Sequence, residues 1–456
     1  MSVLLDGLGN PVSPGAATTL AAVDGFLTGF IGYTPRILEP LAAADKDPTH
    51  CLVNAYAGWL WMFSEAPQGP QQAAKYLLRA EAAAPGATVR EQLTTALLAR
   101  WVAGDIDGAT AAAERILAVA PRDLAALKLH QYFNFNRGRC TEMLRIALAA
   151  LPVAADVPQL HGMLAFAFEQ CHLLEDAERA ANQALALKPT EPWAQHALAH
   201  VMLTQGRIEE GIRFLEARTG HWDGLTSFMY THNWWHLAVF YISEGRYEAA
   251  LAIHDQHVWA RDRDYSQDQV GAVSLLARLE LAGQPVGTRW TALGEYLGAR
   301  RADVVEPFLS LQYLYGLGRA GRGEADALLA AIVTHAREAP ASVRATWAEV
   351  ALPAARGLLA HARGDDATCL ADLGQALGRM LETGGSHAQR DLFAQIHLDS
   401  LIRSGADGVA QQVLEQRRAG EANGVPGNHA LARLYTRLGL PAQAATAAAR
   451  AVRPQS

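Results

Sequence analysis

The sequence predicts an all-α chain built from repeated helical hairpins. Apolar residues make up 50% of the chain and charged residues only 19%. Alanine, the strongest helix former, recurs throughout. Segments that begin with a turn and end at a proline also recur, as in residues 104–121 and 172–189. No stretch rich in Val, Ile and Thr with a period of two indicates a sheet, so nearly all regular structure is expected to be helical.

A position that is mostly occupied by a small residue recurs at a fixed spacing in these segments. It falls on Ala109, Met143, Ala177 and Gly211, each 34 residues after the one before, and on Ala250 after a longer loop. This is the period of the tetratricopeptide repeat, in which pairs of antiparallel helices stack into a solenoid. A small residue lets the paired helices approach, and proline ends the second helix. We therefore expect a tetratricopeptide-like solenoid with a right-handed superhelix.

The length of the chain indicates more than one compact core. At 456 residues it exceeds the usual size of a single domain, and an array of repeats is one way to use that length. We divide it into an N-terminal helical segment at residues 1–50, the repeats at 51–260, and a second helical half at 261–456.

Charge and cysteine content restrict the expected partners and compartment. The formal net charge is −7 and no block of five or more Lys and Arg occurs, which predicts no nucleic-acid and no membrane partner. No CxxC pair occurs among the cysteines, and no basic leader or long apolar run is present. A cytoplasmic protein is expected, and an oligomer is possible. The four cysteines are Cys51, Cys140, Cys171 and Cys369.

Two His-x3-His pairs stand out in the stretches "WAQHALAH" and "HNWWH". His196 and His200 form the first pair, and His232 and His236 the second. Residues four apart share one face of a helix, so each pair presents two imidazoles on one side. Counted back from the small residues, both pairs fall on the first helix of neighbouring repeats, which lines the concave groove. We expect the four rings to share one pocket.

Three kinds of chemistry fit such a pocket. One histidine as general base, with Asp255 setting its tautomer, would serve a hydrolase or lyase acting on a small-molecule substrate without a cofactor. The four imidazoles could instead ligate a transition metal of an oxygenase or hydrolase, although neither E-x-x-H nor H-E-x-x-H spacing is present. The third possibility is a non-catalytic scaffold that binds a peptide or protein. We give the hydrolase or lyase first place and keep the other two as alternatives.

The walls of the pocket are assigned to aromatic and polar neighbours. Trp193, Trp234 and Trp235 would form an apolar wall, unless they are ordinary core residues of the hairpins. In "TGGSHAQRD", Ser386 is a plausible N-cap, and Arg390 with the helix N-terminus could meet an anionic group of the substrate. The alternative for this stretch is a helix cap followed by a surface Arg–Asp pair.

The same stretches resemble the tetratricopeptide repeat protein 38 family, also called StaR-like. The likeness rests on "WAQHALAHVMLTQGRIEEGIRFL", "HNWWHLAVFYISEGRYEAALAIHDQHV" and "TGGSHAQRDLF", and it runs from about residue 50 to the C-terminus. It implies a helical solenoid with a curled, pocket-forming shape, but no particular reaction. The positions it marks as shared are His196, His200, His232, Asn233, Trp235, His236, Asp255, His257, Asp268, Gln389, Arg390 and Asp391.

Overall fold

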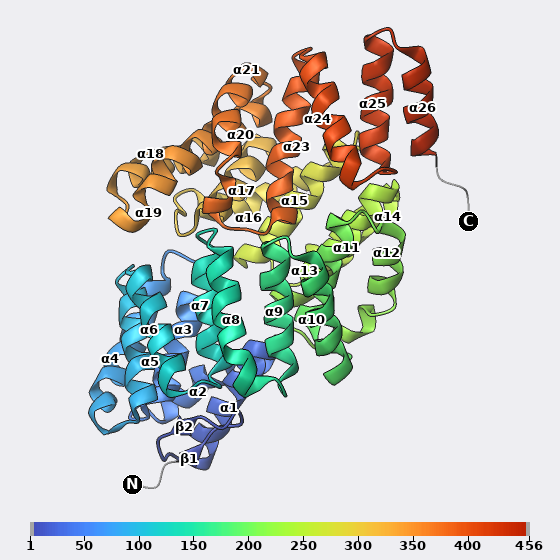
Figure 1. Ribbon diagram of the computed structural model, residues 1–456. Coiled ribbons are helices and arrows are strands. Elements are labelled where there is room, and N and C mark those ends of the chain that lie inside the picture. Colours follow the sequence, from blue (N-terminus) through green and yellow to red (C-terminus); the bar gives the residue numbers. More distant parts are fainter. Residues whose placement is uncertain (1–3, 453–456) are drawn as a thin grey trace. The chain divides into compact units, whose positions relative to one another are not determined.

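The computed structural model describes residues 4–452 and confirms the all-α prediction (Figure 1). The only strands among these residues are two short ones, β1 (Leu4–Leu5) and β2 (Pro11–Val12), which pair antiparallel. They precede the first helix within the segment that was expected to be helical. Among residues 4–452, no helix combines the length and apolar character needed to cross a bilayer.

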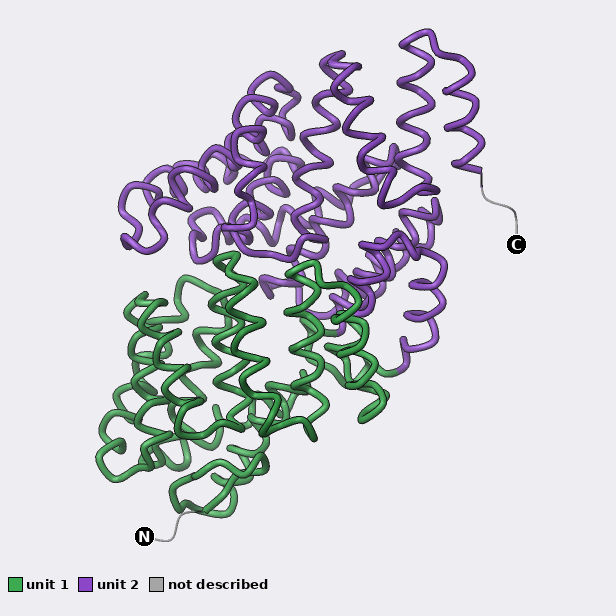
Figure 2. The backbone as a smooth tube through the Cα atoms, in the orientation of Figure 1, with its two compact units in different colours: residues 1–197, 221–229 green, residues 198–220, 230–456 purple. Residues whose placement is uncertain are grey.

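The chain forms two compact units (Figure 2). The first comprises residues 1–197 and 221–229, and the second residues 198–220 and 230–456, so the division passes through helices α11 and α13. The domain limits at residues 50 and 260 were placed from the repeat pattern and not from compactness, so they stay predictions.

The helices of the first unit run as follows: α1 (Ala17–Gly32), α2 (Glu39–Lys46), α3 (Cys51–Met62), α4 (Gly69–Ala83), α5 (Val89–Val102), α6 (Ile106–Val119), α7 (Leu124–Phe135), α8 (Cys140–Ala154), α9 (Pro158–Gln170), α10 (Leu174–Leu187) and the first part of α11 (Pro192–Thr204). Its short 3₁₀ segments are η1 (Pro35–Leu38) and η2 (Ala84–Gly86), and η3 (Thr219–His221) ends at its boundary.

The second unit contains α12 (Ile208–Glu216), most of α13 (Ser227–Glu244), α14 (Tyr247–Ile253), α15 (Ser266–Leu281), α16 (Arg289–Leu297), α17 (Pro307–Arg319), α18 (Glu324–Glu338), α19 (Ala341–Thr346), α20 (Leu352–Arg363), α21 (Asp366–Thr368), α22 (Gly374–Leu377), α23 (His387–Arg403), α24 (Asp407–Gly420), α25 (Val425–Arg437) and α26 (Pro441–Ala451). Its 3₁₀ and π segments are η4 (His254–Val258), η5 (Gly298–Arg300), η6 (Trp347–Ala351), η7 (Cys369–Leu373) and η8 (Met380–Thr383).

The recurring small position is buried in each hairpin. Ala109, Ala177 and Ala250 are fully buried on α6, α10 and α14, and Met143 is buried on α8. On α12, a Cβ added to Gly211 would lie 2.4 Å from the Phe240 ring of α13. At Gly211 the missing side chain thus allows a close helix–helix contact, here with the helix that follows the hairpin.

A left-handed residue sits five positions before each of these sites, in the turn between the paired helices. Glycine takes that conformation in four hairpins, where its missing Cβ avoids the steric cost. In the α9–α10 hairpin it is taken by His172, at φ 58°. The four glycines are Gly104, Gly138, Gly206 and Gly245.

Candidate functional site

Three of the predicted histidines lie together inside the second unit. His200 is on α11, and His232 and His236 are one helical turn apart on α13. The ring centroids are 4.5 Å apart for His200 and His236, and 4.9 Å apart for His232 and His236. Each of the three rings offers a nitrogen that lies within 4.8 Å of the others. We call these three residues the histidine cluster.

The histidine cluster is largely removed from solvent. His200 and His236 are fully buried, while His232 keeps partial exposure. Burial, with a contribution from His200, lowers the pKa of His232 to about 3. A charged imidazole is disfavoured both by desolvation and by a second positive ring nearby, so His232 is neutral at physiological pH.

Trp235 forms one wall of the histidine cluster. Its ring stacks on His232 at 5.4 Å with an interplanar angle of 2°, and its edge meets His236 at 4.8 Å. The Arg278 guanidinium lies 5.6 Å from the same indole. The expectation that Trp235 belongs to an aromatic wall is consistent with this packing, and the indole links the cluster to Arg278.

His196 and Trp193 belong to the first unit and pack there. The two rings stack at 4.3 Å, and Tyr33 and Phe166 lie against Trp193 at 5.2 and 4.8 Å. His196 precedes His200 by one turn of α11 and is buried. Within its unit, it is thus part of an aromatic stack.

Trp234 points to a different set of partners from Trp235. Its ring stacks on His257 at 3.7 Å, almost parallel, and the Tyr230 hydroxyl shares a 2.7 Å hydrogen bond with His257 Nδ1. Among the described residues, the Asp255 carboxylate bonds to Arg289, at 2.6 and 2.8 Å, and to His254. The hydrogen bond from Arg289 lowers the pKa of Asp255. Asp255 is thus held as an ion pair near the surface.

The remaining predicted polar residues of α13 and α15 are buried. Asp268 accepts a 2.9 Å hydrogen bond from the Thr231 hydroxyl and one from the Asp262 amide, so it ties a loop to α13. Asn233 is fully buried, and its side-chain amide has no hydrogen-bond partner in the described part of the chain. Burying an amide without a hydrogen bond costs free energy, so Asn233 is a polar group placed in the interior of the protein.

The stretch "TGGSHAQRD" folds as a capped helix start, as its sequence indicates. Ser386 accepts a hydrogen bond from the Gln389 amide, and the Gln389 side chain accepts one from the Ser386 amide. The Arg390 guanidinium donates to the Gly385 carbonyl. Gln389 therefore serves the capping box, whereas Arg390 turns back over the glycine turn.

This helix start comes back against α11 and α15 within the second unit. The His387 ring lies 5.4 Å from that of His200, and its Nε2 shares a 2.9 Å hydrogen bond with the Thr204 hydroxyl. Arg278 of α15 donates to the Ala388 carbonyl at 2.6 Å. His387 thus lies beside the histidine cluster, although it is far from these residues in sequence.

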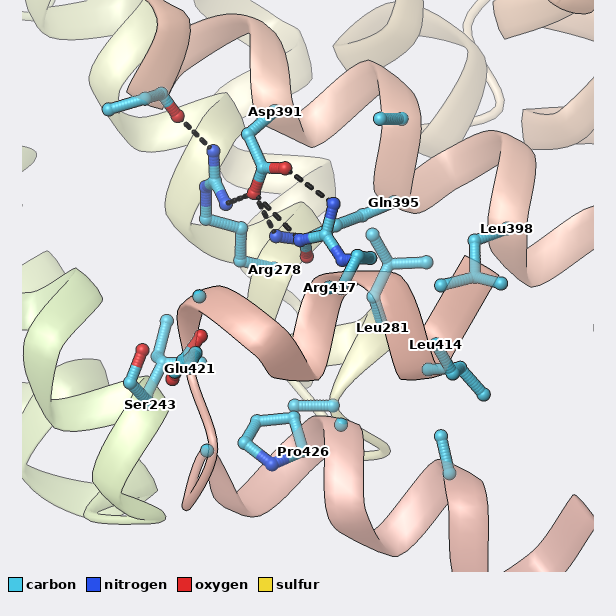
Figure 3. A pocket seen from close by; sticks show the side chains of 18 of the residues that line it. Ser243, Arg278, Leu281, Asp391, Gln395, Leu398, Leu414, Arg417, Glu421 and Pro426 are labelled. Carbon is cyan, nitrogen blue, oxygen red and sulfur yellow. Dashed lines mark hydrogen bonds and ion pairs between the residues drawn. The ribbon is translucent and has the colours of Figure 1, made fainter. Parts of the chain in front are cut away.

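Asp391 is held between two arginines, an arrangement that we call the arginine clamp. It accepts two hydrogen bonds from Arg417, at 2.6 and 3.1 Å, and one from Arg278 at 3.4 Å. Gln395 donates a further one. Burial alone would raise the pKa of Asp391, but Arg417 and Arg278 outweigh it and hold the pKa well below its usual range. Figure 3 shows both guanidinium groups directed at this carboxylate.

A cavity of about 710 Å³ opens beside the arginine clamp, and all of its lining residues belong to the second unit. Its wall combines aliphatic side chains with charged ones from α15, α23, α24 and α25. Five arginines and three carboxylates line it, so positive charge is in excess. The arginines are Arg278, Arg390, Arg417, Arg418 and Arg433, and the carboxylates are Asp391, Asp399 and Glu421.

Three residues that shape this region were not predicted from the sequence. His387 lies in the stretch "TGGSHAQRD", from which only a helix cap and a role for Arg390 were predicted. Arg278 and Arg417 lie on ordinary amphipathic helices, "LLARLELAG" and "LEQRRAG", whose sequence carries no signal of a shared carboxylate. The contact of Arg278 with Asp391 spans 113 residues, so only the fold reveals it.

No known protein-family model matches the chain. Comparison with solved structures finds a human IFIT1 dimer with PPP-AAAA, with 13% identity, a TM-score of 0.42, and coverage of 96% of this chain and 95% of that one. A human IFIT1 dimer with m7Gppp-AAAA aligns at 11% identity and a TM-score of 0.39, with the same coverage. A structure of Naa15/Naa10 bound to HypK-THB aligns at 13% identity and a TM-score of 0.25, over 96% of this chain and 69% of that one.

The expectation of a small-molecule substrate and no nucleic-acid partner is contradicted. The IFIT1 structures that align with this chain hold oligonucleotides, which is the opposite of that expectation. Net charge is also a weak guide to anionic partners of any kind. A formal net charge of −7 averages over the whole chain, whereas the cavity of the second unit gathers five arginines that are far apart in sequence.

Proposed function

We propose that the protein is a non-catalytic helical-repeat scaffold whose second unit binds an acidic peptide segment of a partner protein. The observation that carries this proposal is the cavity of about 710 Å³, lined by five arginines and three carboxylates, in a chain of net charge −7. Clefts of about 300–1,000 Å³ suit ligands of the size of a short peptide. An excess of guanidinium groups favours carboxylates, which arginine binds through two parallel hydrogen bonds.

The arginine clamp provides an internal example of this recognition. Arg417 holds the Asp391 carboxylate through two hydrogen bonds, and Arg278 adds a third contact. The Glu421 carboxylate also interacts with both of these arginines, so the excess of positive charge comes from the whole lining, with five arginines against three carboxylates. At the rim, Arg433 is exposed and forms no ion pair among the described residues. Both features favour an added carboxylate.

The uncharged part of the wall favours a peptide as the occupant. It is largely aliphatic, with Leu203, Val239, Ile242, Leu281 and Leu414 among its members. Among the lining residues that the structure describes, none is tryptophan, tyrosine or phenylalanine. Proteins that bind single-stranded nucleic acids stack the bases on such rings, whereas aliphatic pockets suit leucine-like side chains between acidic ones. An oligonucleotide is the competing occupant in the experiment below.

Acid–base catalysis is outside this proposal. The carboxylate assigned to orient a catalytic histidine, Asp255, bonds instead to Arg289 and His254. Asp255 is therefore engaged elsewhere and does not take the tautomer-setting role that the sequence assigned to it.

The test measures binding of labelled LEDLD, a peptide with a free C-terminal carboxylate, by fluorescence anisotropy. The neutral peptide LQNLN and the oligonucleotide PPP-AAAA serve as alternative probes. Wild-type protein should bind LEDLD in preference to both, and rising ionic strength should weaken binding because rim charges are screened. Preference for the oligonucleotide, or equal binding of both peptides, would reject the proposal.

Charge reversal at the rim locates the binding site. Arg433→Glu removes an attraction worth up to about 1 kcal/mol and adds a repulsion of similar size, so affinity for LEDLD should fall by about tenfold. Arg356 of α20 is a matched control, because it is exposed in the same unit and does not line the cavity. Arg356→Glu should leave the affinity within about twofold; an equal loss in both variants would place binding elsewhere.

A further inference from the structure

We propose that the histidine cluster is a binding site for one transition-metal ion of the zinc class, ligated by His200, His232 and His236. This goes beyond peptide binding, because it assigns a ligand to buried residues that do not line the cavity. It is stated for the three histidines that the second unit contributes.

The geometry of the three rings fits a shared ion. One nitrogen of each ring lies within 4.8 Å of the others. Zinc–nitrogen bonds of about 2.0–2.1 Å at tetrahedral angles place ligand nitrogens about 3.3 Å apart, so side-chain adjustments of about 1 Å bring the rings to ligation distance. The ring planes are steeply inclined, at 64° for His200 and His236 and 85° for His232 and His236. Such rings meet around a point, whereas parallel rings would stack.

The donor atoms select the class of metal. Imidazole nitrogens suit Zn²⁺ and its neighbours Co²⁺, Ni²⁺ and Cu²⁺, whereas Ca²⁺ and Mg²⁺ require oxygen ligands. Three imidazoles also leave a fourth coordination position for water or another ligand.

The surroundings would hold the rings in place and admit the ion. Trp235 stacks on His232 and so restricts its rotation, as the outer shell of a metal site does. His387 lies 5.4 Å from His200, is anchored by Thr204, and lines the cavity. His387 thus contacts both His200 and the cavity, so an ion that enters the cavity comes within one side chain of the histidine cluster.

The experiment titrates the full chain with Co²⁺ and Zn²⁺ after removal of bound metal with a chelator. The expected result is saturable uptake of one ion per chain, with the visible absorption of four-coordinate Co²⁺ and three paramagnetically shifted imidazole signals in the proton NMR spectrum. Zn²⁺ should also raise the Tm, because it binds only the folded state. No saturable uptake by wild-type protein would overturn the proposal and leave the cluster as packed core histidines.

Substitutions assign the ligands. His232→Gln and His236→Gln should each weaken Co²⁺ binding by about 100-fold or more, because a site of three ligands loses one. His335 of α18 is a matched control in the same unit, where it packs against Trp347. His335→Gln should bind Co²⁺ like wild type, and undiminished binding in both cluster variants would overturn the assignment.

Two features keep the result decisive. If buried His236→Gln fails to fold, the partly exposed His232→Gln and the count of shifted imidazole signals in wild-type protein still decide the question. Arg433→Glu, measured in the same titration, should retain metal binding. Failure of peptide binding and failure of metal binding are thereby distinguishable.

Discussion

Removing the carboxylate at the centre of the arginine clamp should destabilise the second unit. Asp391→Asn keeps the shape of the side chain but leaves the Arg278 guanidinium, which is only 4% exposed, without its counter-charge. Breaking a fully buried ion pair from one side costs about 3–5 kcal/mol. The Asp391 and Arg417 side chains are 33% and 35% exposed, so water takes over part of the loss, and we expect about 2–4 kcal/mol.

Denaturant unfolding of the full chain measures this cost. The transition of the second unit should move to lower denaturant concentration in Asp391→Asn, while that of the first unit stays in place. Asp326→Asn is the control, because Asp326 pairs with Arg363 at the surface, where the two side chains are 65% and 48% exposed. It should change the free energy of unfolding by less than about 0.5 kcal/mol. Equal effects of the two substitutions would refute the reasoning.

A double variant separates the stranded charge from the lost hydrogen bonds. Arg278→Met in the Asp391→Asn background removes the uncompensated guanidinium and should recover about 1–2 kcal/mol. The loss of stability at acid pH gives a second measurement. Because the arginines depress the folded pKa of Asp391, its stabilisation is complete above about pH 4, the unfolded value, and is lost as pH falls toward the folded one. Asp391→Asn should lack that part of the acid-induced loss.

Three further predictions concern packing, pH and capping. Gly211→Ala should lower the stability of the second unit by about 1–3 kcal/mol in the same unfolding assay, because the added Cβ would lie 2.4 Å from the Phe240 ring. Gly408 of α24 is exposed and has nothing within 4 Å of an added Cβ, so Gly408→Ala should instead raise the stability by up to about 1 kcal/mol. Burial raises the pKa of Glu191 to about 7. Between pH 4.5 and 7.5, the free energy of unfolding of the wild type should therefore fall by about 3 kcal/mol relative to that of Glu191→Gln. Unfolding at several pH values measures this difference, and equal pH profiles would exclude it. Ser386→Ala removes the cap of α23 and should lower the Tm by the equivalent of about 1 kcal/mol, and an unchanged Tm would contradict that role.

The repeat could be predicted from sequence because its determinants are local. A helix pair needs a small residue at its crossing point and a chain reversal just before it, and both requirements act within one hairpin. The 34-residue spacing of Ala109, Met143 and Ala177 can therefore be recognised in the sequence without knowledge of contacts between distant residues. The left-handed turn at His172 escaped prediction, since histidine at that position does not carry the usual signal of glycine.

The histidine cluster was partly predictable for the same reason. Spacing of four residues places His232 and His236 on one side of α13, and this follows from helix geometry alone. Which rings of the preceding helix they meet depends on the crossing of α11 and α13, which no spacing within either helix determines. Within the second unit, the ring of α11 that meets His236 is that of His200.

The cavity shows why charge counted along a sequence is a poor guide to partners. Arg278, Asp391 and Arg417 lie on three helices, and each looks like an ordinary residue of an amphipathic surface. Folding brings them to one wall, where two cations face one anion and the exposed Arg433 adds another. A ligand responds to this local excess, since at physiological ionic strength charges more than about 8 Å away are largely screened. The acidic remainder of the chain then disfavours non-specific binding of anions without weakening the binding of an acidic peptide in the cavity. The proposed selective scaffold for acidic segments requires this distribution of charge.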